Sequence, residues 1–205
     1  MNEALWALGR GTGVVALALF TMSVLLGILT RSGRPLFGLP RFALTLVHRN
    51  VALLATAFLA VHLVTLLGDS YAQLRLVDFV VPFLGAYKPF WLGLGTVAVD
   101  LLIAVVLTSL ERASVGVRVF RAVHWLTYLI WPVALLHGIG NGTDAGAGWF
   151  IAFAVVCAVA VLSALLWRLT GGFVEYRSVR ADLTQGDQNR TDPKRTDPNR
   201  VERNR

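Results

Sequence analysis

The sequence is short of charged residues. Only 15% of its 205 residues are Asp, Glu, Lys or Arg, against about 25% in a typical soluble domain. Four stretches contain no charge at all, namely residues 11–30, 50–68, 122–143 and 145–167. Each approaches or exceeds the roughly 20 residues that an α-helix needs to cross the hydrocarbon of a bilayer. This composition excludes an ordinary soluble domain.

Cysteine is nearly absent as well. Cys157 is the only one, so no disulfide can form within the chain, and we expect its thiol to pack inside the last apolar stretch. A recognisable cleavage site is also lacking after the first stretch, which is longer than the apolar part of a usual secretory signal. We therefore interpret the first stretch as a retained anchor.

A fifth apolar stretch, residues 89–110, is interrupted only by Asp100. The sequence thus predicts an all-α, polytopic membrane bundle of about five transmembrane helices, formed by residues 11–170. Residues 1–10 are expected to be a short extracytoplasmic N-terminus. Residues 75–89, "RLVDFVVPFLGAYKP", are apolar but short and contain Pro82, so we expect an interfacial or re-entrant piece.

The net charge of +7 first suggests a nucleic-acid partner, but the basic residues follow the predicted topology. With five spans, one side of the membrane carries Arg31, Arg34, Arg41, Arg49, Arg112, Arg118 and Arg121. The other side has only Arg10, Arg75 and Lys88 near the ends of its segments. The positive-inside rule then places the N-terminus outside and the C-terminus in the cytoplasm. We expect contact with membrane lipid and none with nucleic acid.

The last 35 residues, 171–205, differ in character from the rest. They include the repeat "TDPKRTDPNR" and hold almost nothing apolar. Such a composition cannot bury enough surface to offset chain entropy, so a disordered cytoplasmic tail is expected. Lys88 and Lys194 are the only lysines among 19 basic residues, which points to a GC-rich bacterial genome and hence to a bacterial cytoplasmic membrane.

All four histidines fall inside predicted membrane helices. His48 and His62 lie on the second span, and His124 and His137 lie on the fourth. Because a single crossing separates these spans, they run in the same direction. His48 should therefore lie level with His124 near the cytoplasmic face, and His62 level with His137 near the outer face.

The spacing of the histidines supports this arrangement on one helix better than on the other. Fourteen residues separate His48 from His62, which is about 21 Å along an ideal helix and about 40° around it. Thirteen residues separate His124 from His137, which leaves them about 140° apart. We therefore predict that the fourth span bends or unwinds between them, at Pro132, which removes a helical hydrogen bond.

Two facing histidine pairs suggest iron ligation. Imidazole is a suitable ligand for iron, and cofactor sites are often built between facing helices of a bundle. The pattern predicts two haems, one near each membrane surface. A haem-free transporter or scaffold is the rival, in which the histidines bind a divalent metal ion or simply pack. A metal cluster would need its ligands at one depth, which these spacings oppose.

The H-x13-H and H-x12-H pattern on two parallel helices resembles the ferric reductase-like transmembrane domain. Ferric reductases, NADPH oxidases and the haem subunit of the bacterial methionine sulfoxide reductase system share that domain, and the resemblance covers roughly Gly11–Thr170. It implies two b-type haems, with His48 and His124 as axial ligands of the cytoplasmic-side haem and His62 and His137 as those of the outer one. Respiratory cytochrome b uses similar intervals on a longer chain.

The resemblance also implies a function, and with it the need for a separate electron donor. Family members pass electrons outward from a cytoplasmic donor, so we expect the membrane subunit of an oxidoreductase in an electron transport path. Many of them carry a cytoplasmic flavin and nicotinamide domain, but these 205 residues contain no Gly-rich dinucleotide fingerprint. We therefore expect a separate donor, either a cytoplasmic reductase or quinol. A quinol-linked respiratory cytochrome b subunit is the alternative, and the acceptor and any catalytic residue stay unassigned.

Three further polar residues have alternative interpretations. Arg49 and Arg121 flank the first histidine of each helix and would bind haem propionates, since arginine forms strong bidentate hydrogen bonds with carboxylates. Alternatively they are anchors that reach to lipid headgroups. Asp100 would form a buried ion pair with Arg49, because intramembrane charges tend to pair, or would serve as a proton relay.

Overall fold

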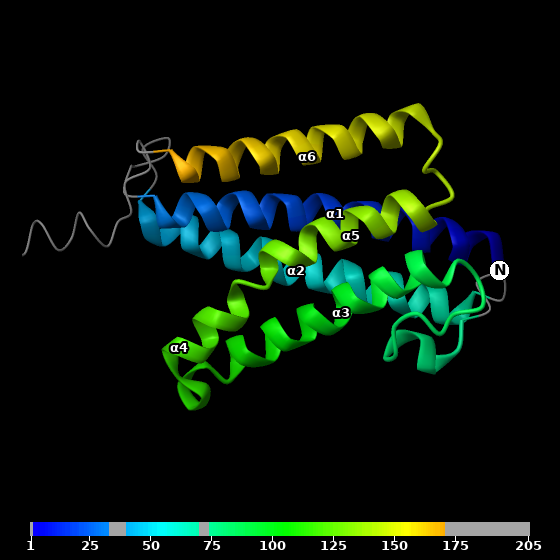
Figure 1. Ribbon diagram of the computed structural model, residues 1–205, viewed down its shortest axis with the longest axis horizontal. Helices are drawn as coiled ribbons and strands as arrows, with labels where there is room; N and C mark the ends of the chain where they lie inside the picture. Colours follow the sequence, from blue (N-terminus) through cyan, green and yellow to red (C-terminus); the bar gives the residue numbers. More distant parts are fainter. Residues whose placement is uncertain (1, 33–39, 70–73, 171–205) are drawn as a thin grey trace, which may run out of the picture.

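The structure, a computed structural model, describes residues 2–32, 40–69 and 74–170. Their regular elements are all helices, as predicted (Figure 1). The order is α1 (Asn2–Arg31), α2 (Arg41–Gly68), the short 3₁₀ helix η1 (Leu76–Phe79), α3 (Pro89–Leu110), α4 (Arg112–His124), α5 (Thr127–Asn141) and α6 (Gly148–Leu169). The predicted disordered tail, residues 171–205, lies outside the described residues.

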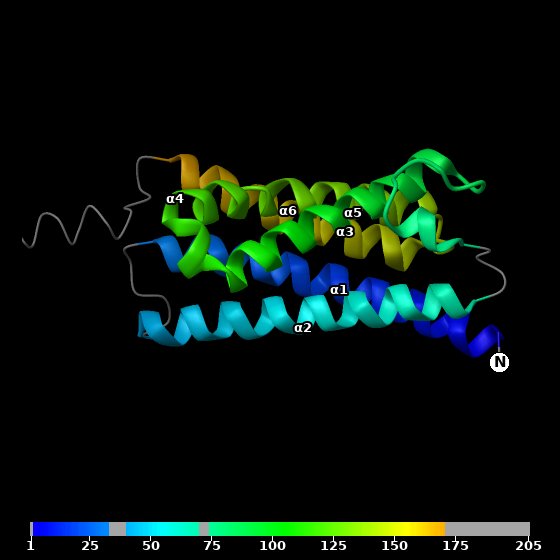
Figure 2. The ribbon, with the colours of Figure 1, turned by 90° about the horizontal axis from the view of Figure 1, so that it is seen from below.

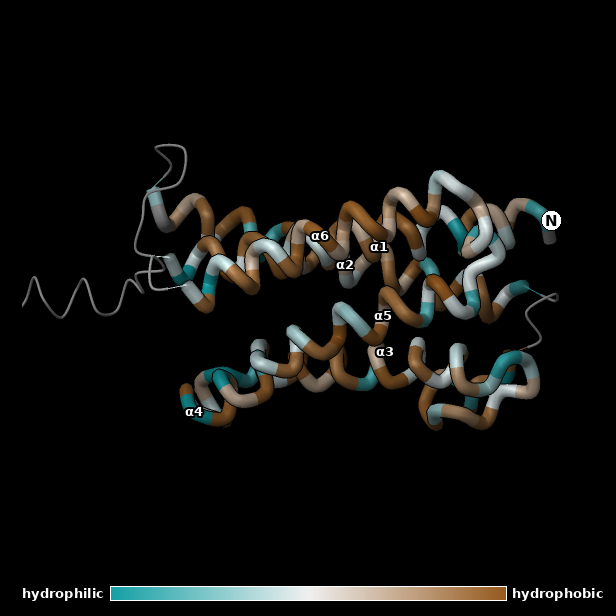
Figure 3. The backbone as a smooth tube through the Cα atoms, turned by 45° about the horizontal axis from the view of Figure 1, so that its top comes forward, coloured by the Kyte–Doolittle hydropathy of each residue, from teal (hydrophilic) through white to brown (hydrophobic). Residues whose placement is uncertain are grey.

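Four helices, α1, α2, α3 and α6, are long and apolar enough to cross a membrane. The fifth crossing is a bent pair, α4 and α5, whose axes meet at 46°. Apolar residues cover the middle of the bundle, and polar ones gather at its two ends and along α4 (Figure 3). Many apolar side chains face outward, such as Val64 (67% exposed) and Val156 (66% exposed). These observations confirm a membrane bundle of about five spans.

The helix α1 lies at the centre of the packing. It packs along α2 on one side and against α5 and α6 on the other. A second group forms where α3 packs against α5 and α4. The beginning of α1 and the end of α6 lie at opposite ends of the bundle (Figures 1 and 2), as an odd number of crossings requires.

Two apolar clusters join these helices. One surrounds Trp131 of α5 and contains Cys157 of α6, which is buried and packs as the sequence predicted. The other surrounds Ile130 of α5 and contains Leu102 of α3. Because Ile130 and Trp131 are neighbours that point to different sides, α5 links α3 to α1 and α6.

Helix α1 begins at Asn2, nine residues before the predicted start at Gly11. The expected short N-terminus is therefore helical from its second residue. The prediction used Arg10 as a boundary, but a charge marks the edge of the hydrocarbon rather than the end of a helix. Arg10 forms an ion pair with Asp144 in the loop before α6, which satisfies its charge at the end of the bundle.

Residues 74–88, which precede α3, fold back along this helix. The hydroxyl of Thr96, at the start of the third turn of α3, donates a hydrogen bond of 2.7 Å to the backbone oxygen of Asp78 in η1. Phe83 packs so closely on Gly93 that a Cβ there would lie 2.2 Å from its ring. This segment therefore covers one end of the helix pair α3 and α5, close to His137.

Candidate functional site

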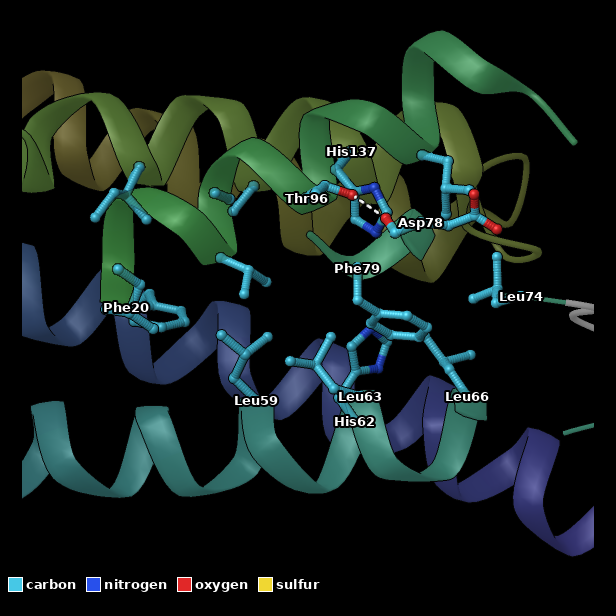
Figure 4. A pocket seen from close by; sticks show the side chains of 17 residues that line it. Phe20, Leu59, His62, Leu63, Leu66, Leu74, Asp78, Phe79, Thr96 and His137 are labelled. Carbon is cyan, nitrogen blue, oxygen red and sulfur yellow. Dashed lines mark hydrogen bonds between the residues drawn. The ribbon is translucent and has the colours of Figure 1, made fainter. Parts of the chain in front are cut away.

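The four histidines meet as two pairs, first with first and second with second. The ring centres of His48 and His124 lie 6.5 Å apart, with their planes at 83°; we call these two the first pair. His62 and His137, the second pair, line one cavity and point into it from α2 and α5 (Figure 4). Each pair thus joins α2 to the bent span formed by α4 and α5.

The pairs occupy a gap in the bundle. Helix α2 packs closely on α1 but makes little backbone contact with α3 or α5. His62 and His137 face each other in the space between α2 and these two helices, and His48 faces His124 between α2 and the end of α4. Along α2 the two pairs are separated by the fourteen residues from His48 to His62, or about 21 Å.

A break in the fourth span brings His124 and His137 to the same side. Four backbone hydrogen bonds of 3₁₀ type lie at this break, from Trp125 to Ala122, from Leu126 to Val123, from Tyr128 to Trp125 and from Leu129 to Leu126. A 3₁₀ residue advances about 120° around the axis, against about 100° in an α-helix. Each such residue therefore removes about 20° of the 140° offset that thirteen ideal helical residues would leave, and the 46° bend between α4 and α5 changes the relative orientation of the two histidines further.

The predicted break was correct, but its predicted position at Pro132 was wrong. The helix is interrupted at Trp125 and Leu126, and Pro132 lies inside α5. The proline withholds a donor only from the carbonyl of Tyr128, four residues earlier. Membrane helices tolerate one such loss, so α5 continues through the proline.

Backbone carbonyls hold the rings of the second pair. Nδ1 of His62 lies 2.7 Å from the carbonyl oxygen of Gly9 in α1, and Nδ1 of His137 lies 2.8 Å from that of Trp91 in α3. A carbonyl can only accept, so each Nδ1 carries the proton. Each Nε2 then keeps its lone pair, which is the state of a metal-binding histidine.

The first pair lacks such partners among the residues that the structure describes. There, Nδ1 of His48 and Nδ1 of His124 are both buried and form no hydrogen bond. The ring of Phe120 stacks on His124, with ring centres 5.3 Å apart. Buried polar atoms are normally satisfied, and among the described residues these two nitrogens are exceptions.

The cavity at the second pair is mainly apolar. It holds about 670 Å³ of space free of protein atoms, part of which opens to the surroundings. Leu59, Leu63 and Leu66 line it from α2, and Gly95, Val99 and Leu102 from α3. Phe79 of η1 enters it beside the two histidines (Figure 4). An apolar cavity with two convergent imidazoles suits a large, flat, hydrophobic metal complex.

The donor set fits haem better than a bare ion. Two imidazoles on one metal, with bonds of about 2.0 Å each, have ring centres about 6 Å apart, close to the 6.5 Å of the first pair. The described residues bring no three His, Cys, Asp or Glu side chains together as a metal site. Zinc usually takes four ligands, whereas haem iron needs only axial ones from the protein.

The other predicted site residues, Arg49, Arg121 and Asp100, lie at exposed or partly exposed positions. Arg49 and Arg121 are exposed at the end of the bundle that holds the first pair. Asp100 is partly exposed at the middle of α3. Within the described part of the chain, the ion pairs join Arg10 to Asp144 and Arg75 to Asp78, and Asp100 forms none with Arg49.

The second pair lies near the end of the bundle where these ion pairs are found. The backbone and side chain of Arg75 both donate to Asp78, at 2.9 and 3.1 Å. The hydrogen bond from the Arg75 guanidinium is the main reason that the pKa of the Asp78 carboxyl is lowered. A charged Asp78 thereby closes the first turn of η1, and the hydrogen bond from Thr96 to the Asp78 backbone oxygen holds η1, and with it Phe79, on α3 beside the cavity.

Sequence reasoning did not find the carbonyls of Gly9 and Trp91 or the place of Phe79. The carbonyls belong to the backbone and carry no residue signature. Phe79 lies in a segment whose only signals were its short apolar run and Pro82, and these indicate a loop without showing where the loop folds.

Comparison with known proteins identifies a family for this chain. The family described as "Ferric reductase like transmembrane component" matches residues 12–135. The match contains His48, His62 and His124 and ends two residues before His137. No curated protein and no solved structure matches the chain. Because the match covers more than half of the sequence, the chain belongs to the ferric reductase-like transmembrane family, whose domains generally bind haem.

Proposed function

We propose that this protein is a two-haem, b-type membrane cytochrome that carries electrons across the membrane as the membrane subunit of an oxidoreductase. His48 and His124 would hold one haem, and His62 and His137 the other. The single observation that carries the proposal is the meeting of all four histidines as two pairs between the same helices. Packing alone gives no reason for such a repeat.

The residues of the chain would perform three tasks. Haem supplies a centre that takes up and releases one electron at a time. The paired imidazoles would hold its iron, and the apolar side chains of α2, α3 and α5 would keep water away from it. The separation of about 21 Å along α2 places the two centres toward opposite membrane surfaces.

The distribution of arginines supports an orientation for the path. The positive-inside rule puts the end with Arg31, Arg112 and Arg121 in the cytoplasm. The first pair then lies on the cytoplasmic side, and electrons enter there from a separate reductase or from quinol. The second pair lies on the outer side, next to η1, in a bacterial cytoplasmic membrane.

Two arginines are placed to serve the cytoplasmic haem. Arg49 follows His48 directly, and Arg121 is three residues before His124. We propose that they bind its propionates, since guanidinium groups recognise carboxylates by paired hydrogen bonds. Arg49→Gln and Arg121→Gln should then shift the midpoint potential of one haem only, and unshifted potentials in both variants would leave these arginines as lipid anchors.

A reduced-minus-oxidised optical spectrum of the purified protein, with a haem count per chain, tests the proposal. We expect a b-type spectrum and two haems per chain. A variant with His48→Ala and His62→Ala, which removes one ligand from each pair, should lose both. Absence of any b-type signal after haem-replete expression would contradict the proposal. If the haems are present, a comparison of their reduction by a quinol analogue with their reduction by a flavin reductase would identify the class of electron donor.

A further inference from the structure

A glycine of a neighbouring helix lies against three of the four histidine rings. A Cβ built on Gly13 of α1 would lie 2.9 Å from the His62 ring, and one on Gly95 of α3 would lie 2.6 Å from the His137 ring. A Cβ on Gly27 of α1 would lie 3.4 Å from the His48 ring. Any side chain at the first two positions would therefore displace an imidazole.

Each of these glycines follows a particular carbonyl by four residues. Gly13 is four residues after Gly9, whose carbonyl accepts from His62. Gly95 is four residues after Trp91, whose carbonyl accepts from His137. Gly27 is four residues after Ser23, whose carbonyl faces the His48 ring, although Nδ1 of His48 stops short of a hydrogen bond.

Helix geometry explains the interval of four. In an α-helix the side chain of residue i+4 lies beside the carbonyl of residue i, which is why Ser and Thr hydroxyls reach that carbonyl. Thr21 in this chain does so, with its hydroxyl 2.8 Å from the oxygen of Leu17. A glycine at i+4 uncovers the carbonyl, so that a side chain from another helix can bind there.

We propose that Gly13, Gly27 and Gly95 are positioning residues that set the orientation and the tautomer of the haem-ligating histidines. This inference rests on the proposed function. Each glycine exposes one backbone carbonyl. At Gly13 and Gly95 that carbonyl accepts the hydrogen bond from Nδ1, which would leave Nε2 to face the iron, and at Gly27 it limits how the His48 ring can turn. His124 has no such glycine among its described neighbours, so its ring is held mainly by Phe120.

The hydrogen bond from Nδ1 to the carbonyl would change the properties of the iron as well as the orientation of the ring. A hydrogen bond from Nδ1 to a carbonyl makes the imidazole a stronger electron donor and is a normal outer-shell control of a metal site. A stronger axial donor stabilises the oxidised iron, so the midpoint potential falls. Loss of the bond should therefore raise the potential of the haem concerned and weaken its retention by about 10–100-fold.

Alanine substitutions test the proposal, with haem per chain, midpoint potentials and the electron paramagnetic resonance spectrum of the oxidised protein as readouts. Gly13→Ala and Gly95→Ala should change the same haem component, the one that His62→Ala and His137→Ala lose. Gly27→Ala should shift the component that depends on His48, and by less, because its contact is looser. This milder variant keeps the test informative if either of the others fails to fold.

Two glycines provide matched controls. Gly11 lies on the same helix as Gly13 with nothing within 4 Å of an added Cβ, so Gly11→Ala should keep both haems and both potentials. Gly148, at the start of α6, likewise has nothing within 4 Å of an added Cβ, so Gly148→Ala should leave the potentials unchanged. If the three test variants behave like Gly11→Ala and Gly148→Ala, the inference is wrong. A wild-type protein without haem would overturn the proposed function as well.

Discussion

Trp131 of α5 donates a hydrogen bond from its indole Nε1 to the hydroxyl oxygen of Thr21 in α1, at 2.9 Å. Both residues are buried. Trp131 lies seven residues after His124 and six before His137, so the bond fixes α5 against α1 midway between the two histidine pairs. It therefore sets the height and rotation at which α5 presents His137.

Replacement of Thr21 by valine should destabilise the bundle, since the indole N–H loses its acceptor inside an apolar core. Hydrogen bonds within membrane bundles contribute about 0.6 kcal/mol on average and up to about 1.7, and we expect a loss near the upper value because the donor stays buried. Thr21→Ser keeps the hydroxyl and should be close to wild type. Unfolding in mixed detergent micelles measures both, and equal stability of the two variants would contradict this role.

The pairing of the histidines leads to a second prediction. His48→Ala and His124→Ala should remove or weaken one haem, and His62→Ala and His137→Ala should remove or weaken the other. The reason is that each pair shares a single centre between α2 and the bent span. Potentiometric titration of the four variants decides it. Loss of the same component from the His48 and His137 variants would mean that the pairs are wrongly assigned.

The pairing could be predicted from the sequence because it depends only on helix direction and on the rise per residue. Two spans separated by one crossing must be parallel, and this places His48 level with His124. The rotation of His137 could not be predicted in the same way. The position of His137 around the helix axis depends on the 3₁₀ hydrogen bonds around Trp125 and Leu126, and the residue types in that stretch do not predict these bonds.

Contacts that use the backbone were also beyond prediction. The glycines at 13 and 95 are visible in the sequence, but their relation to His62 and His137 appears only when α1, α2, α3 and α5 are packed.

For Asp100, the rule that intramembrane charges pair gave Arg49 as the partner. Depth along two helices says nothing of azimuth, and the two side chains form no ion pair.

The Arg75–Asp78 pair gives a pH dependence. The pKa of Asp78 is lowered in the folded protein, so its stabilising contribution is fully present above the ordinary aspartate value of about 3.9 and is lost as the pH falls through the lower folded value. The thermal midpoint of the wild type should exceed that of Asp78→Asn by a constant amount from pH 8 to pH 5. The two should converge in more acidic solution. A difference that already changes between pH 8 and pH 6 would contradict this origin.

Asp100 supplies the last prediction. It lies at the middle of α3, on the same stripe as Ile103 and Leu107, which are 50% and 55% exposed. An aspartate at the centre of a membrane helix costs about 2.5–3.5 kcal/mol on insertion scales, whereas leucine is favourable. Since Asp100 forms no ion pair with the described residues, nothing in that part of the chain offsets the cost.

Asp100→Leu should therefore stabilise the isolated chain, by roughly 2 kcal/mol or more, and keep both haems, because Asp100 does not line the cavity of the second pair. Asp100→Asn, which keeps the shape without the charge, should show a smaller gain. Unfolding in mixed micelles and the haem count measure these effects. If Asp100→Leu instead lowers stability or removes a haem, Asp100 has a task within the chain. A flatter dependence of the midpoint potentials on pH in Asp100→Asn would identify that task as proton uptake coupled to reduction.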